Sequence, residues 1–142
     1  MIKVVGIQID ADEIILVVLQ KDNNGVISQT EECVRFNIAD HTVSAQVQQF
    51  KDQVNSTFDL IAPVVVGIKM RNAKATAAGK VRPPSPISFK LEGIIQLYTK
   101  CPIEFVWPQT ITAFKKKNGD FLTSKNKYQQ DAYDIAYYLL SK

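Results

Sequence analysis

The chain has 142 residues, of which 46% are hydrophobic and 22% are charged, and these are ordinary values for a globular protein. This length allows a core without disulfides and predicts a single domain over residues 1–142. No apolar run approaches the ~20 residues of a membrane span, and the sequence has no leader pattern and no cysteines at metal-ligand spacing. We therefore expect a soluble, cytoplasmic protein without a membrane segment.

Charge is distributed unevenly, although the formal net charge is only +3. Residues 1–60 carry nine acids and four bases, whereas residues 61–142 carry thirteen bases and five acids. Such an asymmetry between the halves of a chain is a recognised hint of a polyanionic partner.

The chain opens with two predicted strands. Ile2–Asp10 is mostly apolar and rich in β-branched residues, which is typical of a central strand covered on both faces. A short polar turn over residues 10–13 leads directly to a second strand, Ile14–Leu19, so the two predict an antiparallel hairpin. The hairpin places the carboxylate of Asp10 at the end of a buried strand.

An edge strand and a helix are expected next. Val26–Phe36 follows an Asn-Gly turn and is predicted as one partly exposed strand. Apolar residues recur every three or four positions from Val43 to Phe58 and predict an amphipathic helix, with Asp40 and Thr42 as candidate N-caps.

The second half alternates strands and helices. The predicted elements are a buried strand at Val64–Ile68, a long basic loop over 69–85, a helix at Pro86–Tyr98, a strand at Ile103–Trp107 and a short helix at Gln109–Phe114. A basic turn at 115–120 and a last helix at Lys127–Leu140 complete the chain.

This element order is the pattern of the α/β ribonuclease H-like fold, and three short pieces strengthen the likeness. They are Gly6–Asp10, Val65–Ile68 and Gln130–Ala136. On these pieces the chain resembles the RuvC-type Holliday-junction resolvases, and it is also similar to a small bacterial family of the same superfamily. The resemblance implies a five-stranded mixed sheet, built as a β-meander followed by αβαβα, with helices on both faces.

The resemblance also implies an activity. In such enzymes, carboxylates from the first strand, the fourth strand and the last helix hold two Mg²⁺ ions that hydrolyse phosphodiesters, and Mn²⁺ is an alternative ion. Here Asp10, Asp131 and Asp134 match those catalytic and metal-binding positions. Asp10 ends the first strand, and the two acids of the last helix are three residues apart and share one side of it. Branched DNA and a homodimer are the implied partner and assembly.

One position departs from the family pattern. Lys69 follows the fourth strand where the family has a metal-binding glutamate, and an ammonium group contacts phosphate but does not hold Mg²⁺. Either Glu92 replaces the missing catalytic acid, or Lys69 fills the metal position and the protein binds nucleic acid without cleaving it. Simpler readings stay open: Asp10 as a turn residue, and Asp131 and Asp134 as acids that favour the helix dipole.

Basic side chains are the candidate contacts to a phosphate backbone, which requires charge and carries no sequence code. They are Lys69, Arg71, Lys74, Lys80, Arg82, Lys115, Lys116, Lys117, Lys125 and Lys127. The alternative is that they are solvated loop residues of a protein-interaction domain with no site.

Overall fold

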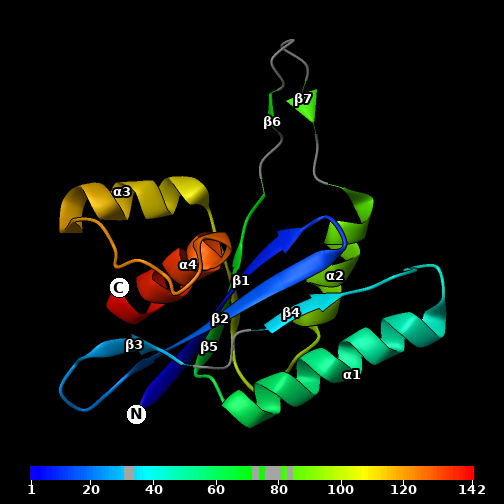
Figure 1. Cartoon of the computed structure of the whole chain (residues 1–142), viewed down its shortest axis with the longest axis horizontal. Helices are drawn as coiled ribbons and strands as arrows, with labels where there is room; N and C mark the ends of the chain where they lie inside the picture. Colours follow the sequence, from blue (N-terminus) through cyan, green and yellow to red (C-terminus); the bar gives the residue numbers. More distant parts are fainter. Residues whose placement is uncertain (31–33, 72–73, 76–80, 83–84) are drawn as a thin grey trace.

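The structure is a computed structural model that describes residues 1–30, 34–71, 74–75, 81–82 and 85–142. Its main element is a mixed sheet of order β3-β2-β1-β5-β8, in which β4 also pairs with β2 (Figure 1). β1 (Ile2–Asp10) and β2 (Glu13–Lys21) form the expected antiparallel hairpin. β5 (Val65–Lys69) runs parallel to β1, and β8 (Ile103–Val106) runs parallel to β5. The central position predicted for β1 is confirmed.

Two strands replace the single edge strand predicted over Val26–Phe36. β3 (Ile27–Gln29) pairs with the end of β2, and β4 (Val34–Asn37) pairs with its beginning. Leu19 faces Gln29 but Leu16 faces Val34, so the register shifts by two residues between the two pairings. The prediction of five strands is therefore wrong, because the main sheet contains six strands among the described residues.

Helices cover both faces of the sheet, as predicted. α1 (Ser44–Ile61) and α2 (Pro86–Gln96) lie on one face, while α4 (Gln130–Ser141) lies on the other with α3 (Pro108–Asn118) beside it (Figure 1). A 3₁₀ turn at Lys127–Gln129 precedes α4. Among the described residues, no helix is both long enough and apolar enough to cross a bilayer.

α3 is longer than the short helix expected at Gln109–Phe114. It continues through Lys115, Lys116 and Lys117, so the basic turn predicted there is wrong. The three ammonium groups lie in the last helical turn, where positive charge is favoured by the negative end of the helix dipole. The long loop predicted over residues 69–85 is also wrong in part. Lys69 belongs to β5, and β6 (Lys74–Ala75) pairs antiparallel with β7 (Val81–Arg82).

β1 separates two apolar cores. Val5, Ile7 and Ile9 belong to the core that contains the buried residues of α1 and α2. Val4 belongs to the core that contains the buried residues of α4. Because side chains alternate along a strand, Gly6, Gln8 and Asp10 face the same side as Val4, which is the side of α4.

Candidate functional site

Glycines allow α4 to approach the centre of the sheet. A Cβ atom at Gly6 of β1 would lie 2.0 Å from the carbonyl oxygen of Ala132 and 2.8 Å from the backbone nitrogen of Ala136. A Cβ atom at Gly67 of β5 would lie 2.5 Å from Cδ1 of Leu139. Because Gly6 and Gly67 have no side chains, α4 packs directly on the neighbouring parallel strands β1 and β5, and its beginning lies close to the end of β1 (Figure 1).

Gln8 connects the end of β1 to α4. Its Oε1 accepts a hydrogen bond from the backbone N–H of Ala132 at 2.9 Å, and its Nε2 donates to Oδ2 of Asp10 at 3.3 Å. The side chain is buried, whereas Asp10 is exposed. One amide thus connects the exposed carboxylate of Asp10 to the first turn of the last helix, which carries Asp131.

Lys69 lies at the same edge of the sheet. It is the last residue of β5, and its Nζ is 2.8 Å from Oδ2 of Asp131. The side chain of Asp131 is 54% exposed and that of Lys69 is 32% exposed, so solvent screens this ion pair and its stabilising effect is small. Lys69 therefore occupies one oxygen of Asp131, which was predicted as a metal ligand.

Asp134 is held more tightly. Its Oδ2 is 2.9 Å from Nζ of Lys115 in α3, and its Oδ1 accepts a hydrogen bond from Nε2 of Gln130 at 2.8 Å. Its side chain is only 13% exposed. Burial raises the pKa of the neighbouring Tyr133, and the charges of Tyr137 and Asp134 raise it further. Asp134 is thus anchored between two helices, whereas Asp10 and Asp131 face solvent.

Glu92 has a basic partner of its own. Its carboxylate in α2 is 2.6 Å from the guanidinium of Arg71, and the guanidinium carbon is 4.8 Å from the centre of the Phe89 ring. Within the described part of the chain, no group of three or more acidic, histidine or cysteine side chains gathers as metal ligands. The placed side chains therefore do not fit a two-metal site, since each α4 acid and Glu92 already contacts a cation.

The remaining predicted basic contacts are spread over several elements. Lys74 faces Arg82 across the β6–β7 hairpin, and Lys80 lies outside the described residues. Lys116 and Lys117 are exposed on α3. The backbone of Lys125 donates to Oε1 of Gln29 at 2.9 Å, and Lys127 begins the 3₁₀ turn before α4.

Two features of this edge were missed in the sequence. Gln8 could have been found, because it is a polar residue inside an apolar strand and lies two positions before Asp10, on the same face. The contact of Arg35 with Tyr128, whose ring centre is 4.7 Å from the guanidinium carbon, leaves no such signal in the spacing.

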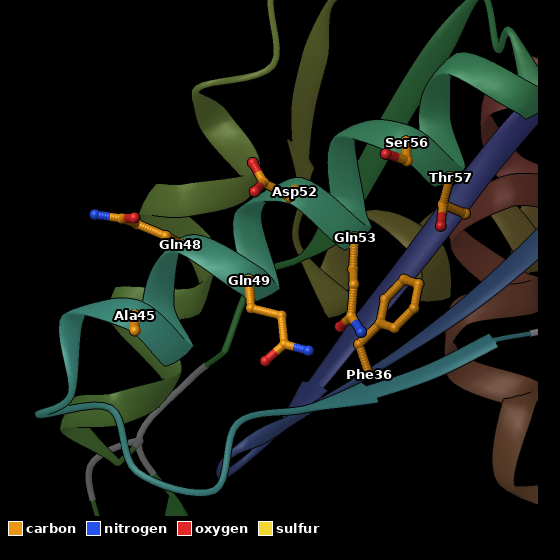
Figure 2. A pocket seen from close by; sticks show the side chains of 8 residues that line it. All are labelled: Phe36, Ala45, Gln48, Gln49, Asp52, Gln53, Ser56 and Thr57. Carbon is orange, nitrogen blue, oxygen red and sulfur yellow. The ribbon is translucent and has the colours of Figure 1, made fainter.

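A groove lies elsewhere, between the edge of the sheet and α1. Figure 2 shows Phe36 of β4 facing polar side chains of α1, among them Gln49 and Gln53. The groove has a volume of about 540 Å³, and none of its lining residues is a predicted site residue. The site at the end of β1 is thus an exposed edge and not this groove.

The chain belongs to the family described as "Protein of unknown function (DUF3010)", which matches residues 2–139. No curated protein matches the chain. The family assignment therefore adds no activity to the geometry of the site.

Solved structures share the fold. The Thermus thermophilus RuvC structure is 11% identical with a TM-score of 0.69, and the match covers 95% of this chain and 91% of RuvC. RuvC of the same organism in complex with a Holliday junction substrate is 12% identical with a TM-score of 0.63, covering 96% of this chain and 90% of that one. The yeast mitochondrial Holliday junction resolvase Ydc2 is 11% identical with a TM-score of 0.62, covering 96% and 77%. The resemblance stated from the sequence is confirmed at the level of the fold.

Proposed function

We propose that the protein is a nuclease that acts on branched or otherwise structured nucleic acid at the edge formed by the ends of β1 and β5. The observation that carries the proposal is the convergence of Asp10, Asp131 and Lys69 there, with Gln8 joining the first acid to α4. The fold shared with junction resolvases supports this choice of substrate.

Asp10 and Asp131 are the proposed catalytic carboxylates. Both are exposed, so a divalent cation can reach them, and Mg²⁺ and Mn²⁺ prefer such oxygen ligands. A single ion held by these two carboxylates would supply activation of water, one of the roles that ions have in phosphodiester hydrolysis. Lys69 must leave Asp131 before an ion binds it, and Asp134 and Glu92 join only if Lys115 and Arg71 release them.

The other expectations accompany this proposal. The protein acts as one domain over residues 1–142, in the cytoplasm, and a homodimer would present two such edges to the arms of a junction. The basic residues of the β6–β7 hairpin, of α3 and of the segment before α4 would contact the phosphate backbone.

A second candidate function is binding without cleavage. It is favoured by the ion pairs of Lys69 with Asp131 and of Lys115 with Asp134, because an ammonium group on each carboxylate takes the role that a metal ion would have. The same lysines can exchange the carboxylate for a phosphate, since phosphate contacts need only charge. Such binding would weaken with salt and would not require a metal ion.

One experiment separates the two candidates. Labelled four-way junction, linear duplex and RNA–DNA hybrid are incubated with Mg²⁺ or Mn²⁺ and the wild type, Asp10→Asn, Asp131→Asn or Lys69→Gln. Asp52→Asn on α1 is the matched control, because this acid lies in the groove away from the site. Cleavage by the wild type and by Asp52→Asn, lost in the other two acid variants, supports the nuclease.

Binding without cleavage supports the second candidate. In that case Lys69→Gln should lower affinity and reduce its salt dependence, whereas Asp131→Asn should not. A wild type that neither binds nor cleaves any of the three substrates would contradict both functions.

A further inference from the structure

An aromatic ring is fixed at the surface immediately before α4. Tyr128 lies in the 3₁₀ turn, is 43% exposed as a residue, and belongs to neither apolar core of the described residues. The guanidinium carbon of Arg35 lies 4.7 Å from its centre, in the range of a cation–π contact. Nε2 of Gln129 lies 3.4 Å from the Tyr128 hydroxyl. The ring is therefore held in place without being buried.

Arg35 is fixed in turn from the side of Asp10. Its guanidinium forms an ion pair with Glu13, the first residue of β2 after the turn that follows Asp10. The hydrogen bond to Glu13 raises the pKa of Arg35 most, and the charges of Glu13, Tyr128 and Asp10 raise it further. Arg35 thus contacts both the aromatic ring and Glu13, at the turn that follows Asp10.

The chain segment that contains the ring carries positive charge. Lys125 and Lys127 precede it, and residues 121–130 contain no acid. The side chain of Arg35 is 54% exposed. An exposed ring among cations has the composition of a stacking platform for single-stranded nucleic acid, in which the ring takes a base and the cations take phosphates.

We propose that Tyr128, held by Arg35, stacks an unpaired nucleobase of the nucleic acid that lies across the end of β1. The inference rests on the proposed function and narrows its substrate class to nucleic acid with at least one unstacked base beside the phosphate contacts. A fully paired, linear duplex has no such base, whereas a single strand and a gap have unpaired bases, and at a branch point the continuous base stack is interrupted.

The test is a binding titration with three labelled ligands of equal length. They are a single strand, the same single strand with abasic sites at its central positions, and a linear duplex. The variants are Tyr128→Ala, Tyr128→Leu and Tyr128→Phe, and Leu122→Ala is the control because Leu122 is an exposed apolar residue of the same segment. A 2-aminopurine base at the central position reports stacking directly through quenching of its fluorescence.

We expect Tyr128→Ala and Tyr128→Leu to bind the intact single strand about tenfold more weakly, within the range measured for loss of one base–aromatic stack. Affinity for the abasic strand and the duplex should hardly change, and Tyr128→Phe should retain both affinity and quenching. Leu122→Ala should behave as the wild type.

Two results overturn the inference, and they differ in what else they overturn. Equal binding of the intact strand by the wild type and Tyr128→Ala, with unchanged quenching, refutes the stack while leaving the nuclease and the binding function intact. Absence of any salt-sensitive binding by the wild type refutes the proposed function and the stack with it.

Discussion

The two faces of the central strand are built in different ways. The face of β1 toward α1 and α2 carries Val5, Ile7 and Ile9, which are at most 5% exposed and pack in an apolar core. The face toward α4 passes from Val4 through Gly6 to Gln8 and Asp10, so side chains there become small and then polar toward the end of the strand. One strand thus separates two apolar cores, and on the α4 side its end also positions charged groups at an edge.

The difference between the two faces of β1 indicates which substitutions each face can tolerate. On the α1 side, the free energy of folding comes from buried area, and any loss of volume is felt. On the α4 side an apolar core is also present, but toward the end of β1 the helix lies against glycine and is joined to the strand by one amide, so this part of the packing depends on close approach and a single hydrogen bond. Four measurements test this contrast, beginning with the largest expected effect.

The largest loss of stability is expected for Phe58→Ala. Phe58 of α1 is fully buried, and its ring centre is 5.0 Å from that of Tyr98 in an edge-to-face contact. Its removal should lower the free energy of unfolding by about 3–5 kcal/mol, which urea denaturation would measure. A loss below about 1 kcal/mol would contradict the view that this face is a tightly packed core.

Gly6→Ala should follow, because the new methyl group meets the backbone of α4. We expect a loss of about 3 kcal/mol, at the upper end of the usual cost of overpacking, and displacement of the helix. Gly93→Ala is the matched control: Gly93 lies in α2, nothing lies within 4 Å of its added methyl group, and Ala favours a helix interior by about 0.5–1 kcal/mol. Equal unfolding free energies for the two variants would show that the close approach of α4 to Gly6 does not limit the size of this side chain.

Gln8→Ala should cost less stability and affect the site more. It leaves the N–H of Ala132 without its acceptor, and an unpaired buried donor costs about 1–2 kcal/mol. Amide hydrogen exchange at Ala132 should accelerate, while exchange in α1 stays unchanged. Gln20→Ala, which removes only an exposed hydrogen bond to Ser28, serves as the control and should have little effect.

The smallest effect is expected in alkaline solution. Burial raises the pKa of Tyr98 to about 12, and its hydrogen bond to Asp59 adds to the shift. In the unfolded chain a tyrosine ionises near pH 10, so between pH 10 and 12 the folded state binds more protons and stability falls as pH rises. Urea unfolding at pH 9 and pH 11 should show a larger decrease for the wild type than for Tyr98→Phe.

Local patterns predicted most of the fold. The hairpin of β1 and β2 and the stripe of apolar residues in α1 depend on neighbours in the sequence, so periodicity and turn chemistry reveal them. The division of the edge strand into β3 and β4 is different, because it depends on the register against β2 and not on propensity. The length of α3 was missed because three consecutive lysines resemble a loop, although they suit a helix C-terminus.

The candidate site was predicted only in part. The sequence could place Asp10 at the end of a strand, and it could place Asp131 and Asp134 on one side of a helix from their spacing. Their partners could not: Lys69 meets Asp131 across 62 positions, and Arg35 meets Tyr128 from another element. Such contacts arise from the packing of α4 on the sheet, and whether Asp10, Asp131, Asp134 and Glu92 act in catalysis stays a prediction for the cleavage experiment.

The bond between Gln8 and Ala132 has a consequence for synthesis of the chain. It joins residues 124 positions apart, so the ribosome completes the first strand long before the helix that orders the site exists. A nascent chain shorter than about residue 132 carries Asp10 without its anchored amide neighbour. The edge is therefore complete only when the last helix has been made and has docked on the first strand.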